Sequence, residues 1–203
     1  MKSTLNLRSP RIMVIGIMLP LVFFFQSCSK HSDDNGGGGS SSKYYLSATV
    51  NGEAWSANIN STLDNAPAVA TTTTSNGVQC IFLIGIRGSG KDTSALALIF
   101  PKNIALSQAY NFDAVHYSEG AFAVQTSPGA TTFFGYTTVP ATGGSGTFTV
   151  TTFDETANIV EGTFSGTFGS QDGKPSQQFT NGKFRCAYTT NVNQLPKSGG
   201  LKF

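Results

Sequence analysis

The glycine-rich stretch from Gly85 to Asp92 is the segment whose spacing comes nearest to a known chemistry. Its sequence, GIRGSGKD, fits the pattern G-x-x-x-x-G-K of loops that bind nucleotide phosphates through backbone amides. Such a loop needs a serine or threonine after the lysine to hold magnesium, and a helix must follow it. Here Asp92 follows the lysine, and residues 94–100 alternate as a strand does. We therefore predict a hairpin turn, with no nucleotide and no other cofactor.

The titratable side chains offer few combinations for catalysis or metal binding. His116 is the only histidine after residue 42, which excludes a metal site built on several imidazoles. Asp113 and Glu119 flank it at equal spacing, but on the strand expected over residues 111–117 His116 points away from both acids. No G-x-S-x-G pattern supplies a nucleophilic serine. We predict a surface histidine, no catalytic residue and no metal ligand.

Three acids in predicted turns leave one enzymatic alternative open. Asp154, Glu155 and Asp172 all lie between strand-like runs. Glycoside hydrolysis needs two carboxyl groups about 5 to 9.5 Å apart, a separation that sequence does not measure. Because acids in turns are ordinarily solvated, a noncatalytic domain is the main prediction, and a hydrolase using turn carboxylates is the alternative.

Aromatic side chains offer a second kind of chemistry, which is the stacking of sugar rings. The amphipathic candidates are Trp55, Tyr44 and Tyr45, and then Tyr117 and Tyr136. Trp55, just after the first predicted turn, is the foremost of these. Packing in the core is the interpretation that we favour for it, with ligand stacking as the alternative.

The amino terminus has the arrangement of a bacterial lipoprotein signal. Basic residues precede fourteen uncharged, mostly apolar residues from Ile12 to Phe25, which is the size of a signal-peptide core and short for a membrane span. The stretch Phe25-Gln26-Ser27-Cys28 resembles a lipobox, although Phe25 stands where leucine is usual. The resemblance implies cleavage after residue 27 and acylation of Cys28, which anchors the chain in a membrane through two or three acyl chains.

A polar leader and a flexible tether follow the predicted acylation site. The leader Ser29-Lys30-His31-Ser32-Asp33-Asp34 resembles the short acidic signal of surface-exposed lipoproteins in the Bacteroidota, and a merely solvated tether is the alternative. Residues 35–42 read NGGGGSSS, which behaves as a flexible coil. We therefore expect a signal peptide over 1–27, a lipidated tether over 28–42 and one domain over 43–203, at the outer membrane and facing outward, with the periplasmic face as the alternative.

The charge of the mature chain limits the classes of partner that it could bind, and its cysteines leave the question of a disulfide open. Three of the thirteen basic residues leave with the signal, so ten remain against eleven acids and no basic cluster persists. A nucleic-acid partner is therefore not expected, because it requires concentrated positive charge. Cys80 and Cys186 lie in apolar runs of an exported chain, where a disulfide and two buried free thiols are both open.

The mature chain reads as a single all-β domain, an antiparallel sandwich or a barrel-like fold. Short alternating runs recur between turn residues, and no helical period persists. Residues 58–76 are expected to be loop or edge, and 104–110 one helical turn. The alternation predicts that Phe148-Val150-Thr152, Phe164-Gly166-Phe168 and Phe184-Cys186-Tyr188 face the core. Strands are expected over 45–50, 53–57, 78–87, 94–100, 111–117, 121–125, 132–139, 146–153, 159–168 and 179–188.

Both ends of this domain resemble a family of uncharacterised Bacteroidota lipoproteins. The opening ATVNGEAWSA over residues 48–57 is similar to the family's first hairpin, and the succession GTF at 146–148, GTFSGTF at 162–168 and TNGKF at 180–184 is similar to its closing portion. The resemblance implies a lipid-anchored β domain and no activity. From the sequence we expect a noncatalytic binding or structural protein of the envelope, with a glycan-binding module for polysaccharide capture as the alternative; its partners would be the membrane and a glycan or an envelope protein.

Overall fold

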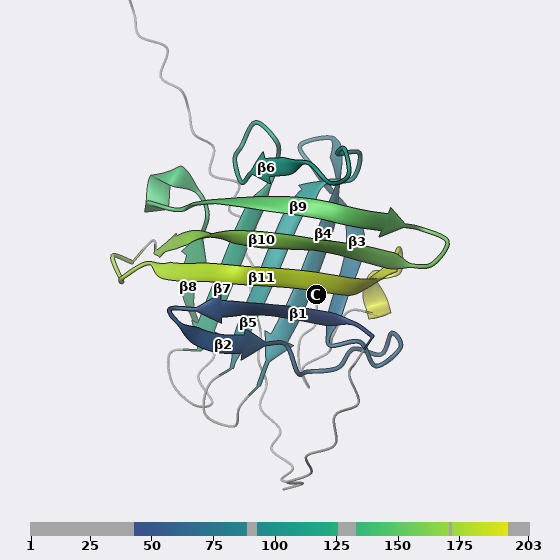
Figure 1. Ribbon diagram of the computed structural model, residues 1–203, viewed down its shortest axis with the longest axis horizontal. Helices are drawn as coiled ribbons and strands as arrows, with labels where there is room; N and C mark the ends of the chain where they lie inside the picture. Colours follow the sequence, from purple (N-terminus) through teal and green to yellow (C-terminus); the bar gives the residue numbers. More distant parts are fainter. Residues whose placement is uncertain (1–42, 89–92, 126–132, 171, 195–203) are drawn as a thin grey trace, which may run out of the picture.

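The computed structural model describes residues 43–88, 93–125, 133–170 and 172–194, which fold as two layers of β-strands. The predicted signal peptide and tether lie outside these residues. In Figure 1 the strands of the front layer run across those of the back layer at a large angle. This is the orthogonal form of sheet packing, in which the strands of two stacked sheets cross and some strands pass from one layer to the other. The prediction of a single all-β domain is confirmed.

Six strands form the front layer and five form the back layer (Figure 1). The front layer contains β2 (Glu53–Ser56), β1 (Tyr45–Val50), β11 (Gln177–Thr189), β10 (Ile159–Ser170), β9 (Ser145–Asp154) and β6 (Ala109–Asn111), in that order. The back layer contains β3 (Ala68–Ser75), β4 (Val78–Arg87), β5 (Ser94–Pro101), β7 (Glu119–Gln125) and β8 (Phe133–Thr137). Two short 3-10 helices complete the described elements, η1 (Pro140–Thr142) and η2 (Val192–Gln194).

Two long strands join the layers into a partial ring. The end of β11 pairs in parallel with β3 from Ala187 to Thr189, and the end of β10 pairs with β8 at Gly169 and Ser170. Since β10 and β11 also pair with each other, the hydrogen-bonded order closes through β11, β3, β4, β5, β7, β8 and β10. At each of these two corners, a single strand therefore runs from the front layer into the back layer without a break.

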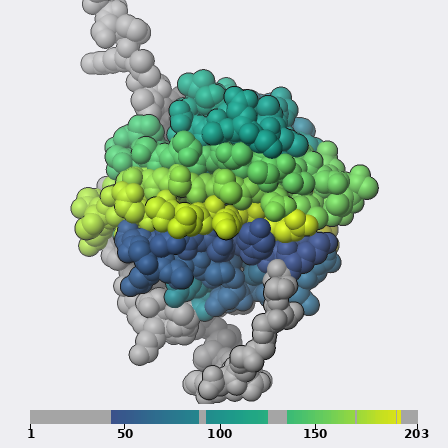
Figure 2. Space-filling model, viewed as in Figure 1, coloured from purple at the N-terminus to yellow at the C-terminus, as the bar shows by residue number. Residues whose placement is uncertain are grey.

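The interior between the layers is rich in phenylalanine. Phe168 stacks on Phe179 with ring centroids 4.1 Å apart, and Phe148 stacks on Phe112 at 4.9 Å and on Phe100 at 5.2 Å. Each buried aromatic side chain removes a large apolar area from water, so these rings supply much of the driving force for folding. The outward side chains of the front layer, such as Thr163 and Lys183, are exposed. Figure 2 shows them as a continuous surface in successive bands from β9 down to β1.

The β-bulges decide which residues face this interior. Asn181 has a φ of 53°, and around it β11 shifts register against both β1 and β10, so β11 has a bulge at this position. A second shift on β9 leaves Thr151 without a partner on β10. Because a bulge inserts one residue, the alternation slips there. Phe148 and Val150 face the core as expected, but Phe153 packs against it in place of Thr152.

Three segments differ from their predicted structure. Residues 68–75 were expected to be loop or edge but form β3, which pairs with β4 along its whole length. Threonine is β-branched and therefore suits a strand, and Asn76 and Gly77, with φ of 49° and 79°, close the hairpin that follows. The predicted helical turn at 104–110 is instead turn and the short β6, and the predicted strand at 111–117 is mostly turn, with Tyr117 at a φ of 50°.

The first hairpin and the central pair follow the prediction closely. Asn51 and Gly52 adopt φ of 50° and 87°, as a tight two-residue hairpin turn requires, and join β1 to β2. β4 is buried on both of its faces, with Ile81 and Leu83 in the main core and Cys80, Ile84 and Ile86 on the other side. It pairs with β5 from Cys80 to Arg87.

Candidate functional site

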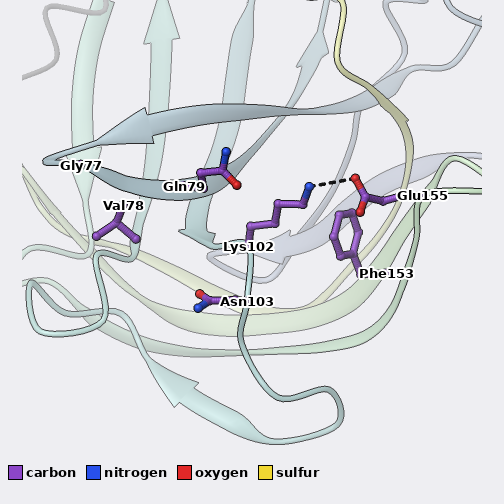
Figure 3. Close-up of a pocket in the computed structure, with 7 residues that line it drawn as sticks. All are labelled: Gly77, Val78, Gln79, Lys102, Asn103, Phe153 and Glu155. Carbon is purple, nitrogen blue, oxygen red and sulfur yellow. Dashed lines mark hydrogen bonds and ion pairs between the residues drawn. The ribbon is translucent and has the colours of Figure 1, made fainter.

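An open pocket lies where three separate segments meet, and it is the candidate site of this molecule. Its volume is about 630 Å³, which is within the usual range for small-molecule sites. The turn between β3 and β4, the residues that follow β5, and the end of β9 with its turn into β10 contribute the lining (Figure 3). The residues that line it are Gly77, Val78, Gln79, Lys102, Asn103, Phe153 and Glu155.

Hydrogen bonds to the backbone hold the segments that line the pocket in place. The backbone amide of Lys102 donates to the carbonyl of Gln79 at 2.9 Å, which extends the β4–β5 pairing by one residue beyond Pro101. On the opposite side, the carboxylate of Asp154 accepts from the backbone amides of Thr156 and Ala157, both at 2.8 Å. This turn leaves the neighbouring Glu155 side chain directed at the pocket.

An ion pair crosses the pocket and joins its two sides. The Lys102 Nζ and the Glu155 Oε1 lie 2.8 Å apart, and the dashed line in Figure 3 marks this contact. The Lys102 side chain is 26% exposed and that of Glu155 is 55% exposed, so water reaches both groups. The hydrogen bond that the Lys102 ammonium donates to Glu155 is the main reason that the pKa of Lys102 lies above its ordinary value. Lys102 is therefore a cation at neutral pH.

An aromatic pair lies behind this ion pair. Lys102 Nζ is 5.7 Å from the centroid of the Phe153 ring, and Phe153 meets the Tyr188 ring edge to face at 5.2 Å. The Tyr188 hydroxyl lies 2.6 Å from the Thr72 hydroxyl on β3. Phe153 is half-buried while Tyr188 is buried in the main core. The pocket wall is thus continuous with the packed interior, which keeps Phe153 in place.

The aromatic residues proposed for stacking from the sequence lie elsewhere. Trp55 is 4% exposed, donates from Nε1 to the Ser94 hydroxyl at 2.8 Å and meets Phe122 edge to face. Tyr44 is also 4% exposed, in a smaller cluster at the β11–β3 corner, whereas Tyr45 is half-buried. Trp55 and Tyr44 are part of the packing and present no ring face to solvent, and Tyr136 is buried as well.

Cys80 and Cys186 are free thiols, so of the two alternatives left by the sequence the disulfide is not formed. Cys186 lies in the main core, whereas Cys80 alternates with Ile81 and therefore points to the other face of β4. The two sulfurs cannot meet across the back layer. Burial raises the pKa of both thiols, which disfavours the reactive thiolate form.

The candidate acids and the histidine occupy separate places. Asp154 is bonded within its own turn and Glu155 is paired with Lys102, so these sequence neighbours serve different partners. Asp172 is exposed, and its backbone amide donates to Ser170. His116 lies in a turn rather than on a strand, and there its Nδ1 contacts the Asp113 carboxylate at 2.7 Å. The expectation that His116 points away from Asp113 is wrong, because the turn folds the two side chains together.

The remaining sequence motifs are only partly described. Cys28 and the leader from Ser29 to Asp34 lie outside the described residues, as do residues 89–92 of the glycine-rich stretch. Arg87 and Ser94 are partners at the end of the antiparallel β4–β5 pair, so the stretch joins two strands and not a strand to a helix. Within the described ranges, no cluster of three or more His, Cys, Asp or Glu side chains could hold a metal, and no helix is long and apolar enough to cross a membrane.

The pocket residues themselves were not identified from the sequence, apart from Glu155. Lys102 and Asn103 lie just beyond the end of β5 at Pro101, and Gln79 is the second residue of β4, close after the Asn76-Gly77 turn signal. That position could have marked them as rim residues. These residues meet in one pocket because of the way in which the two layers cross, and no local sequence pattern predicts that crossing.

Comparison of this chain with protein-family models, with curated proteins and with solved structures finds no match in any of the three.

Proposed function

We propose that this chain is a lipid-anchored protein of the outer membrane whose β domain faces outward and binds a ligand or partner without catalysing a reaction. The observation that carries the anchoring is the succession of basic start, apolar core and Phe25-Gln26-Ser27-Cys28. The resemblance of both ends of the domain to uncharacterised Bacteroidota lipoproteins supports the same assignment. The polar, glycine-rich sequence between Cys28 and Lys43 is of the composition that links an anchor to a domain in the water beside the membrane.

The binding role is supported by the open pocket beside Lys102 and Glu155. Three segments far apart in the sequence meet there, and polar and aromatic groups line the same space. Capture of a glycan is the binding role that this composition favours, because sugars present hydroxyl groups together with apolar ring faces. A hydrolase is the less favoured alternative, since Asp154 and Glu155 engage different groups.

The anchoring is tested by detergent phase partitioning and by the mass of the protein purified from cells. Wild type is expected in the detergent phase, with a mass that shows fatty acyl groups on a chain beginning at Cys28. The Cys28→Ala variant is expected in the aqueous phase and unacylated. Cys80→Ala is the matched control, because it removes a different cysteine and should stay in the detergent phase. Wild-type protein without acyl groups would contradict the proposal.

The outward orientation is tested by adding a protease to intact cells. If the leader directs the domain to the surface, wild-type protein is degraded from outside, and replacing Asp33 and Asp34 with asparagine reduces the degraded fraction. Degradation only after the outer membrane is opened would place the domain on the periplasmic face and refute this part of the proposal, while leaving the lipid anchor intact.

A further inference from the structure

The pocket beside the Lys102–Glu155 pair carries hydrogen-bonding groups that the protein itself does not use. In the part of the chain that the structure describes, the Gln79 and Asn103 carboxamides have no hydrogen-bond partner, and both residues are exposed. Each carboxamide offers two donors and one acceptor oxygen. The second carboxylate oxygen of Glu155 is likewise unpaired, and Lys102 has protons beyond the one directed at Glu155. Unused donors and acceptors therefore line one open space.

The charges of this pocket cancel. Among the described residues that line it, Lys102 is the only cation and Glu155 the only anion, and they lie 2.8 Å apart. An anionic ligand would have to compete with Glu155 for the ammonium, and a cation would have to compete with Lys102 for the carboxylate. A neutral ligand avoids both costs and still accepts and donates hydrogen bonds to the pair.

The lining also includes an apolar portion. Phe153 and Val78 are half-buried, and both belong to the pocket (Figure 3). The ring of Phe153 is held from behind by its edge-to-face contact with Tyr188. A fixed aromatic surface next to exposed carboxamides suits a molecule with carbon-bound hydrogens on one side and hydroxyl groups around its rim. Pyranose rings have this form.

From these observations we propose that the pocket binds a neutral saccharide, with Gln79 and Asn103 bonding its hydroxyl groups, Phe153 contacting its ring and the Lys102–Glu155 pair completing the hydrogen bonds. This assignment rests on the noncatalytic binding role proposed above and adds the ligand class and the residues. The volume of about 630 Å³ accommodates one or two sugar units of a longer chain. The openness of the site to water suits the capture of such a chain from outside.

The first test is a glycan array that carries neutral and acidic oligosaccharides, probed with the mature chain purified from cells in detergent. Signals on neutral oligosaccharides are expected. The best neutral oligosaccharide is then titrated by calorimetry against wild type and variants, each checked for its β-sheet circular dichroism. Because binding is measured without reference to the membrane, a protein that lacks acyl groups but binds the sugar would refute the anchor and leave the site standing.

The variants distinguish this pocket from other surfaces. Gln79→Ala and Asn103→Ala are each expected to weaken binding by about 3- to 10-fold, as the loss of one or two hydrogen bonds predicts. Asn60→Ala is the matched control, because Asn60 is an exposed carboxamide outside the pocket. It should leave the affinity unchanged. Equal affinity for wild type and both pocket variants would overturn the assignment to this site.

Glu155→Gln separates the ligand classes, since it keeps the hydrogen-bonding shape and removes the charge. A neutral saccharide should lose less than about 3-fold in affinity, because the glutamine amide replaces the carboxylate as a partner. An acidic ligand should instead bind more tightly to this variant, once Lys102 is released. An array on which only acidic glycans bind, or on which nothing binds, would overturn the proposal.

Discussion

Phe148 and Phe153 stand five residues apart on β9, yet they belong to regions with opposite physical characters. Phe148 is buried among stacked aromatic rings, whereas Phe153 lies half-exposed at the rim of the open pocket. The shift in register at Thr151 lies between them. The extra residue brings Phe153 to the same side of β9 as Phe148 but at the strand end, where its ring packs against the core and also lines the open pocket. The interior is organised by apolar packing, and the pocket by the ends of strands.

The largest difference between the two regions should appear when each loses one ring. Phe184 is fully buried in the main core, and Phe184→Ala should destabilise the domain by about 3 to 5 kcal/mol. Phe153→Ala removes a half-buried ring and should cost clearly less in stability, while it weakens saccharide binding. Urea unfolding measures the first effect and calorimetry the second. Similar stability losses in the two variants would show that the pocket wall is structural.

Close approach of backbones in the front layer gives the next largest effect. A Cβ added at Gly162 would lie 2.1 Å from the Thr149 carbonyl oxygen and 2.5 Å from the Phe184 ring, so neighbouring atoms must move. Gly162→Ala should therefore cost about 1 to 3 kcal/mol. At Gly135 nothing lies within 4 Å of the added Cβ, and Gly135→Ala should change the free energy of unfolding by less than about 0.5 kcal/mol. Equal effects in urea unfolding would argue against this packing.

Trp55 provides a direct comparison between packing and binding. Trp55→Phe removes the bond from the indole N–H to the Ser94 hydroxyl, which is buried, and should cost about 1 to 2 kcal/mol in stability. Tyr45→Phe removes a hydroxyl from a half-buried ring and serves as the control, with less than about 0.5 kcal/mol expected. Neither change should alter saccharide affinity. If Trp55→Phe lost binding without losing stability, the result would support the alternative that Trp55 contacts the ligand.

The smallest expected effect is a pH dependence at Glu119 on β7. Burial raises the pKa of this carboxyl group above its ordinary value, so the folded chain binds the proton more tightly than the unfolded chain. The resulting stabilisation is present at acidic pH and is lost as the pH rises through the pKa of the folded state. Glu119→Gln removes this dependence and should raise the Tm at pH 7 by about 1 to 3 °C, a change of under 1 kcal/mol in a domain of this size.

Thermal melts at pH 4 and pH 7 would measure the effect of Glu119→Gln. The gain should be present at pH 7 and smaller at pH 4, where the carboxyl group of the wild type is largely neutral. Glu53→Gln, on the exposed edge strand β2, is the control and should give the same Tm as wild type at both pH values. A gain that is equal at both values of pH would mean that burial of the Glu119 charge is not its cause.

Alternation along the chain was sufficient to predict most of the strands and much of the core. The runs that became β1, β4, β9, β10 and β11 were located within two residues, and Phe148, Phe164, Phe168 and Phe184 were placed in the core. Local chemistry was also sufficient for the Asn51-Gly52 turn. It was insufficient at β3, where four consecutive threonines look like an exposed loop in the sequence but all pair with β4 in the structure. It was also insufficient at Thr152, where the bulge displaces the alternation by one residue.

The sequence by itself determined that this chain forms β-strands, because periodicity and turn residues act over a few neighbouring positions. It also carries the pattern that predicts lipidation at Cys28, since that pattern consists of consecutive residues and does not depend on the fold of the domain. The tertiary structure alone decided that Trp55 is buried, that Cys80 and Cys186 lie on different faces of the back layer, and that Lys102 meets Glu155. Those outcomes depend on how the two layers cross. The crossing brings together residues that are far apart in the sequence, and no local pattern predicts their contact.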